Sequence, residues 1–396
     1  MKFAIFGTAR TPIGNFGGAF RDVRPQFLFR DAIKASFERS GLEDYTHIYD
    51  CIGGNAVQPS DCANITRVSI LLAGFPMEIP AYTVMANDVS SLVAVTNAIQ
   101  AMITGEGSLY LVGGTESAST APYIVRGARW GFRFNHGTVN DMLAELRIDA
   151  NQQKWYCELV GKVLKEKYGI PREEMDRFAA MSHKKAFRAL REQKFKGQIT
   201  PVTVKKKAAG KEVMPEIVSE DEGINPVMSP KKAAKATPFF NGLDLTEVNT
   251  YRNADGAASF FIATEEKIKE LQLTPEAYII GYGFSGTHPD DPVAALFESM
   301  RNAADRAGVK IDEIEVFELD ETFAGAALAA LKEFGIPEEK VNVWGGALAL
   351  GHPIGAQGAI MTVKLVHIMK TLDKKLGMVA LSSLGGQAVS IVISKE

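Results

Sequence analysis

Residues 345–356 read Gly-Gly-Ala-Leu-Ala-Leu-Gly-His-Pro-Ile-Gly-Ala, a His-Pro turn held between glycines. Glycine permits positive φ and proline fixes φ, so this stretch predicts a tight loop. The apolar spacing after Ala356 predicts that the loop leads directly into a helix. A histidine held in such a loop, His352, is a candidate site residue.

The composition is that of a globular chain without an unusual partner. With 396 residues the chain predicts two or three packed units, and its net charge of −3 gives no basic excess for nucleic acid. No apolar run approaches the roughly 20 residues of a membrane helix, and Met1–Gly7 resembles a buried strand rather than a signal peptide. Cys51, Cys62 and Cys157 lack metal spacing, which favours reduced thiols in a cytoplasmic protein without a metal.

Strand and helix patterns alternate along both ends of the chain. The apolar run Leu109–Val112 ends in glycine, and Ser91–Ile103 has helical spacing. This alternation predicts α/β layers around a largely parallel sheet. Residues 121–238 are charged, helical and lysine-rich, and the alternation returns in the last third at 277–283, 293–307 and 314–319.

The two outer parts share an outline. In each part a polar loop precedes a helix, and an apolar strand associated with Gly-Gly follows. In the first part the helix begins after Asp88 and the strand is 109–114; in the second the helix begins after His352 and the strand is 378–386. No residue-level repeat survives, so the outline alone indicates a duplicated fold only weakly.

Several motifs in one order resemble those of the thiolases, which make or break carbon–carbon bonds in coenzyme A thioesters. Besides the His352 loop, the matching segments are Ala9–Gly14, Gly113–Ser117 with Ala121–Tyr123, Lys167–Asp176, Ile199–Val202 and Asp255–Ala258. The resemblance covers nearly the whole chain. It implies an α/β thiolase-like fold, in which two similar α/β halves layered α-β-α-β-α carry an inserted helical loop domain.

The resemblance also implies domain bounds and partners. We expect an N-terminal half at 1–120, completed by 245–270, a loop domain at 121–244 and a C-terminal half at 271–396. We expect acyl-CoA as the ligand and a homodimer or a dimer of dimers. Some thiolases recruit a small zinc-containing OB-fold subunit, which remains open for this chain.

A thiolase carries a nucleophilic cysteine at the start of a buried helix. Counting back without gaps from Gly113-Gly114 places Asp88 at that position. An alignment with a two-residue deletion would instead place Ser90 there. Asp88 is suited to proton transfer or to orienting water, because a carboxylate attacking a thioester would form a reactive mixed anhydride. The alternative is that Asp88 only caps the helix through Ser91.

Two further thiolase positions are altered and one is kept. Ser382 stands where the second cysteine would be, and an unassisted hydroxyl is a poor proton shuttle. Asp320 replaces the asparagine of the Asn-Glu-Ala-Phe loop and would repel an oxyanion unless protonated or paired. His352 is the kept position, and the resemblance implies that it lines an oxyanion hole.

The resemblance implies that coenzyme A binds between the inserted domain and the core. Tyr251 and Arg252 replace a serine contact of the family, and with Glu321 and Phe323 they are the predicted coenzyme A contacts. Lysines at 205–207 and 231–235 are candidates for the phosphates, although such runs are usually solvated.

Three hypotheses for function remain open. In the first, Asp88 or His352 transfers a proton in the cleavage of a 3-hydroxyacyl- or 3-oxoacyl-CoA, without an acyl-enzyme. The second is a catalytically silent subunit that binds acyl-CoA or supports an active partner. The third is an acyl-CoA acyltransferase with an unexpected nucleophile. We favour the first, because polar, proton-competent groups stand at the altered positions.

Overall fold

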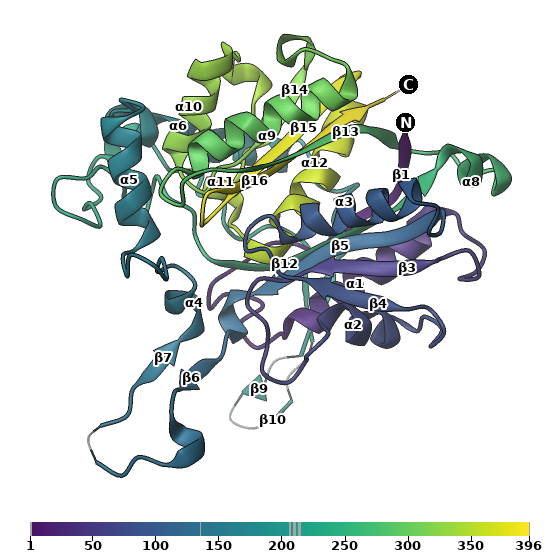
Figure 1. Ribbon diagram of the computed structural model, residues 1–396, viewed down its shortest axis with the longest axis horizontal. Coiled ribbons are helices and arrows are strands. Elements are labelled where there is room, and N and C mark those ends of the chain that lie inside the picture. Colours follow the sequence, from purple (N-terminus) through teal and green to yellow (C-terminus); the bar gives the residue numbers. More distant parts are fainter. Residues whose placement is uncertain (1, 135, 206, 209–210, 213–214, 396) are drawn as a thin grey trace.

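The computed structural model describes residues 2–134, 136–205, 207–208, 211–212 and 215–395 (Figure 1). Among these residues no helix is both long enough and apolar enough to span a bilayer.

The strands of both halves join in one mixed sheet. Those of the first half are β1 (Phe3–Arg10), β2 (Gly14–Asn15), β3 (Asp50–Gly54), β4 (Ala81–Val84), β5 (Leu109–Ser117) and β12 (Ala254–Thr264). Those of the second are β13 (Ala277–Gly286), β14 (Val316–Leu319), β15 (Leu376–Ser383) and β16 (Gln387–Ser394). The halves meet where Phe3–Ile5 of β1 pairs antiparallel with 277–279 of β13.

The strand order is duplicated. In the first half the order β3-β5-β12-β1 begins with a parallel pair and continues with two antiparallel pairs. In the second half β14-β15-β16-β13 repeats the same order and the same senses. The predicted two similar halves are therefore present, and the pairing reveals them although the residues do not repeat.

The expectation of a largely parallel sheet was wrong. Antiparallel pairs outnumber parallel ones among the described strands, because each half returns through a strand antiparallel to its neighbours, β12 or β16. Strands buried on both faces read as continuous apolar runs, so the run itself does not reveal the sense of pairing.

Helices cover both outer faces and fill the centre, which completes the predicted five layers (Figure 1). Around the first half lie α1 (Pro25–Ser40), α2 (Ile65–Ala73) and α8 (Glu265–Glu270); around the second lie α9 (Pro292–Ala307) and α10 (Ala324–Phe334). The central layer contains α3 (Ser90–Ile103) and α12 (Gln357–Leu372), and the short α11 (Ala347–Leu350) precedes the His352 loop. Single 3₁₀ turns occur at Ala118–Thr120, Ala128–Trp130, Ile311–Glu313, Glu338–Lys340 and Ile354–Ala356.

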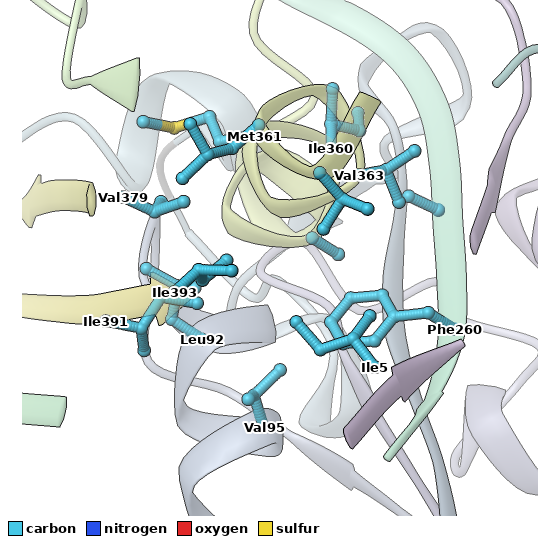
Figure 2. Close-up of a cluster of buried hydrophobic side chains, with 14 of the residues drawn as sticks. Ile5, Leu92, Val95, Phe260, Ile360, Met361, Val363, Val379, Ile391 and Ile393 are labelled. Carbon is cyan, nitrogen blue, oxygen red and sulfur yellow. The ribbon is translucent and has the colours of Figure 1, made fainter. Parts of the chain in front are cut away.

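Alternation along the strands divides the core into layers. Phe3 and Ile5 of β1 join the central cluster, whereas Ala4 and Phe6 pack with α1 on the outer face. Figure 2 shows the central cluster, in which side chains of α3 and α12 meet both parts of the sheet. The ends of α3 and α12 are thereby held rigidly beside each other, and the candidate site lies at these ends.

The segment between the halves combines short strands with helices, of which α6 is the longest and packs against the second half. It contains β6 (Tyr123–Val125), β7 (Val139–Asp141), α4 (Met142–Glu145), α5 (Tyr156–Glu166), α6 (Arg172–Arg191), β8 (Val202–Val204), β9 (Lys207–Ala208), β10 (Lys211–Glu212), β11 (Glu216–Val218) and α7 (Pro230–Ala233). The β6–β7 hairpin projects away from the body (Figure 1). The predicted bounds of the three domains stay a prediction.

Candidate active site

Four loops meet at one end of the central layer. The turn before α3 carries Asp88, the residue after β14 is Asp320, the end of β15 carries Ser382, and the loop after α11 carries His352. All four side chains are buried, with exposed fractions of 1%, 0%, 4% and 0%. The structure thus brings together the four residues that the sequence predicted as catalytic.

Asp88 does not cap α3. The N-cap position is Val89, which makes no side-chain capping bond, and the turn is closed instead by Ser90, whose hydroxyl donates to the carbonyl of Asn87 at 2.6 Å. Asn87 itself adopts φ +49°, a left-handed conformation that asparagine tolerates. The capping interpretation was therefore wrong, and Asp88 is free to point across the site.

Asp88 uses only one of its two oxygens within the protein. Its Oδ2 accepts hydrogen bonds from Ser383 Oγ at 3.1 Å and from the backbone N–H of Leu384 at 3.3 Å. Its buried Oδ1 has no hydrogen-bond partner among the described residues and lies 3.5 Å from Nε2 of His352. Burial raises the pKa of Asp88 to about 6, against the opposing effect of these donors.

His352 is held by its backbone and covered on one side. Its N–H donates to the carbonyl of Arg252 at 2.9 Å, and the Tyr251 ring lies against the imidazole with 4.9 Å between centroids. Nε2 is 3.4 Å from Oγ1 of Thr322, and the buried Nδ1 has no hydrogen-bond partner in the part of the chain that the structure describes. Burial lowers the pKa of His352 to about 4, so the imidazole is neutral near pH 7.

Asp320 is paired with Ser382, the serine predicted to stand at the position of the second cysteine. Its Oδ2 accepts a short hydrogen bond from Ser382 Oγ, and its Oδ1 accepts one from the backbone N–H of Thr322 at 2.6 Å. Burial raises the pKa of Asp320. This pairing gives the Ser382 hydroxyl a carboxylate to assist it, and Asp320 does not face the site unpaired. The sequence could not show the pairing.

Arg147 is a site residue that the sequence analysis missed. Its guanidinium carbon lies 4.9 Å above the Tyr251 ring, and its Nη2 donates a short hydrogen bond to Oδ1 of Asn253. The positive charge of Arg147 lowers the pKa of both Asp88 and His352. Arg147 stands in the loop between α4 and α5, and no local motif distinguishes this partly buried arginine from the exposed arginines of the chain.

Of the predicted coenzyme A contacts, two are engaged inside the protein. Arg252 donates from Nη2 to the carbonyls of Gly223 and Ala349, at 2.7 and 3.0 Å. The buried Glu321 accepts from Ser182 Oγ at 2.8 Å and from Asn342 Nδ2 at 2.7 Å. Both therefore brace the His352 loop against its surroundings, and their role as ligand contacts stays a prediction.

The other two predicted contacts form an aromatic pair. The rings of Tyr251 and Phe323 meet edge to face with 6.4 Å between centroids, and both are buried. Tyr251 borders the site directly through His352. Coenzyme A contact by either residue stays a prediction.

The three cysteines lie elsewhere in the fold. Cys51 is buried in β3, Cys62 is buried in the loop before α2, and Cys157 is in α5, close enough to Arg147 to interact electrostatically. Burial raises the pKa of Cys157, which disfavours a thiolate there. Among the described residues no group of three or more His, Cys, Asp or Glu side chains is arranged to hold a metal ion.

Of the predicted phosphate-binding lysines, those at 231, 232 and 235 are exposed on or just after α7. Lys206 lies outside the described residues. Phosphate binding by these lysines stays a prediction.

Two family models match almost the whole chain. The thiolase N-terminal domain matches residues 3–266 and the thiolase C-terminal domain matches residues 273–395. The chain belongs to the thiolase family. A probable acetyl-CoA acyltransferase of Staphylococcus aureus is 36% identical to this thiolase-family chain over 395 residues, which cover 100% of the chain and 99% of the relative.

Solved structures agree with this assignment. The acetyl-CoA acetyltransferase of Bacillus anthracis is 33% identical, with a TM-score of 0.95 over 99% of this thiolase-family chain and 98% of its own. Human mitochondrial 3-ketoacyl-CoA thiolase in complex with CoA is 29% identical, with a TM-score of 0.93 over 100% and 98% of the two chains. The thiolase-like fold predicted from the sequence is therefore confirmed.

Proposed function

We propose that this thiolase-family chain is an acyl-CoA enzyme that makes or breaks a carbon–carbon bond without a cysteine acyl-enzyme. The observation that carries the proposal is the unpartnered, buried Oδ1 of Asp88, 3.5 Å from His352 Nε2. Buried polar atoms are nearly always satisfied, so an orphaned carboxylate oxygen beside an imidazole supports a group that meets the substrate.

The pKa shifts support Asp88 as the base. A carboxylate with a pKa of about 6 is ionised at pH 7 and is a stronger base than an ordinary aspartate. The imidazole of His352, with a pKa of about 4, is neutral and offers one donor and one acceptor nitrogen. Proton removal is therefore assigned to Asp88 rather than to His352, which orients or hydrogen-bonds the reacting oxygen.

The reaction balances as a retro-aldol cleavage of a 3-hydroxyacyl-CoA. Asp88 takes the proton of the 3-hydroxyl, the C2–C3 bond breaks, and C3 becomes a carbonyl. The electron pair moves to C2 as the thioester enolate, and protonation of C2 by the Asp88 carboxylic acid restores the carboxylate. In a 3-oxoacyl-CoA the same base instead activates water against C3, and the hydrolytic cleavage gives a carboxylic acid and the shortened thioester.

Coenzyme A is the proposed carrier of the substrate. The human relative was solved in complex with CoA, and its structural match to the present chain covers 100% of this chain and 98% of the relative. Tyr251, Arg252, Glu321 and Phe323 remain the proposed contacts, with Tyr251 the one that borders the site.

A second candidate is thiolysis by an atypical nucleophile. The Staphylococcus aureus and Bacillus anthracis relatives are called an acyltransferase and an acetyltransferase, and this supports acyl transfer for the present chain as well. An acyl group on the enzyme would appear as a covalent adduct in intact-protein mass spectrometry. The lyase predicts no such adduct.

The deciding experiment offers 3-oxo- and 3-hydroxyacyl-CoAs of several lengths, each with and without free CoA, and resolves the CoA products by chromatography. The lyase is supported if cleavage occurs without free CoA, if Asp88→Asn abolishes this cleavage, and if Cys157→Ser retains it. The exposed Asp305 on α9 provides a matched control, Asp305→Asn, which keeps full activity. Cleavage that requires free CoA supports the transferase, and no turnover at all supports a silent subunit.

For the assembly we propose a homodimer or a dimer of dimers, in the cytoplasm. The β6–β7 hairpin supports an association surface, since Trp130 and Phe134 are 83% and 90% exposed in the single chain. Light scattering after size-exclusion chromatography measures the mass directly, and a monomer would contradict the proposal. A zinc-containing OB-fold partner stays a prediction, to be tested by co-purification.

A further inference from the structure

Arg147 is a partly buried cation at the site without an anionic partner. Among the described residues no carboxylate lies within ion-pair distance of it. Within the same described residues, its buried Nε has no hydrogen-bond partner. Among the described residues, the guanidinium interacts with the Tyr251 side chain, whose ring it overlies, and with the neutral amide of Asn253.

Two other arginines that enter the protein have carboxylate partners. Arg10, which is fully buried, forms a two-pronged ion pair with Asp221 at 2.7 and 2.8 Å. Arg172 pairs with Asp176 at 2.7 Å. A buried donor without a partner costs free energy, and guanidinium matches the two oxygens of a carboxylate.

The backbone of Arg147 is held in place. Its carbonyl accepts from the N–H of Tyr156 at 2.9 Å, and Ile148 pairs with Trp155 as an antiparallel bridge. The loop between α4 and α5 therefore closes on itself and presents Arg147 in a fixed position. The side chain meets Tyr251, which in turn covers His352, so the cation lies beside the proposed base and its histidine.

We propose that Arg147 binds a carboxylate carried by the acyl group, so that the substrate is a CoA thioester of a dicarboxylic acid. This inference rests on the proposed function for the identity of the site and adds the class of acyl chain. The N–H of Nε and the second N–H of Nη2, which lie on the same edge of the guanidinium, supply the two donors that a carboxylate accepts, while the other N–H of Nη2 bonds to Asn253. Binding would also neutralise the charge that lowers the pKa of Asp88, making Asp88 a stronger base when the correct chain is bound.

The test uses two thioesters that cannot undergo the proposed cleavage, glutaryl-CoA and pentanoyl-CoA. Both acyl chains have five carbons, and they differ in a terminal carboxylate against a methyl group. Isothermal titration of the full chain should give an affinity for glutaryl-CoA about tenfold or more above that for pentanoyl-CoA, as expected for charge-assisted hydrogen bonds. Arg147→Met should abolish this preference without weakening the binding of pentanoyl-CoA.

Two variants serve as references. Arg147→Lys keeps the charge but lacks the fork of donors, so it should retain a reduced preference. Arg191→Met, at the exposed end of α6, should bind both thioesters as the wild type does.

Equal affinity of the wild type for the two thioesters would overturn the inference while leaving acyl-CoA binding intact. So would an equal loss of both affinities in Arg147→Met, since that is the mark of a structural role. A preference that depends on Arg147 in a chain without lyase activity would support the inference and overturn the proposed reaction. If neither thioester binds, both are overturned.

Discussion

The carboxylate of Asp88 and the imidazole of His352 lie 3.5 Å apart. Burial raises the pKa of Asp88 to about 6 and lowers the pKa of His352 to about 4, which reverses their usual order. The acid thus becomes the stronger base of the pair. Near pH 7 the pair is a carboxylate beside a neutral imidazole, which is the arrangement needed to accept a proton from a hydroxyl.

The first prediction concerns the pH dependence of turnover. Because Asp88 must be ionised to accept a proton, kcat/KM should rise tenfold per pH unit below about 6 and level off above it. His352 is neutral throughout this range and adds no further limb above pH 5. A profile that is flat from pH 5 to 8 would contradict the assignment of Asp88 as the base.

Ser383→Ala should shift the acidic limb of the pH profile of kcat/KM to higher pH. The Ser383 hydroxyl donates to Oδ2 of Asp88 and stabilises its charged form, so removing it raises the pKa of Asp88 further. One lost hydrogen bond to a charged group corresponds to a shift of about one pH unit. Ser382→Ala is the matched control, since Ser382 bonds to Asp320 instead, and it should leave the midpoint of the limb in place.

Asp88→Asn should stabilise the fold in a pH-dependent way. The folded pKa of Asp88, about 6, lies above its ordinary value of 3.8, so its contribution to stability is present below pH 3.8 and is lost as pH rises through 6. At pH 7 the ionised group costs about 3 kcal/mol, which the neutral amide avoids. Denaturant titrations should therefore show a gain at pH 7 that shrinks toward pH 4, and a loss at pH 7 would contradict the shift.

Gly346→Ala should weaken the loop that carries His352. A Cβ at Gly346 would come within 2.2 Å of the Glu321 carboxyl carbon, and Glu321 is the acceptor that holds Ser182, Asn342 and the N–H of Leu348. Displacing this buried carboxylate should cost about 3 kcal/mol or more. Gly286→Ala is the control, because no atom lies within 4 Å of its added Cβ and its melting temperature should hardly change.

Lys364→Met should be more damaging than the loss of a salt bridge at the surface. Lys364 lies 2.9 Å from Glu318 with both side chains almost fully buried, and it also donates to the carbonyl of Gly345. The single change leaves a buried carboxylate without its cation, at a cost of about 3–5 kcal/mol. In a double-mutant cycle, adding Glu318→Gln should recover part of that loss, whereas strictly additive effects would contradict the pairing.

The sequence by itself determined the family and the layered fold, because these depend on motifs that are local in the chain. The glycines show this well: Gly114 admits a backbone carbonyl 2.6 Å from where its Cβ would stand, and Gly355 admits backbone atoms of Asn55 at the same distance. Such close approaches require glycine, so they leave a readable pattern. The same patterns led to Asp88, Asp320, Ser382 and His352, which the structure does bring together.

The tertiary structure alone decided which partner each of these groups has. Ser382 and Ser383 are adjacent in the chain, yet one donates to Asp320 and the other to Asp88. Arg147 reaches the site from a loop with no motif of its own, and the shifted pKa values of Asp88 and His352 come from burial among segments more than 200 residues apart. Hydrogen bonding and desolvation act between groups that meet only in the folded chain, whereas motifs and hydrophobic periodicity act along it.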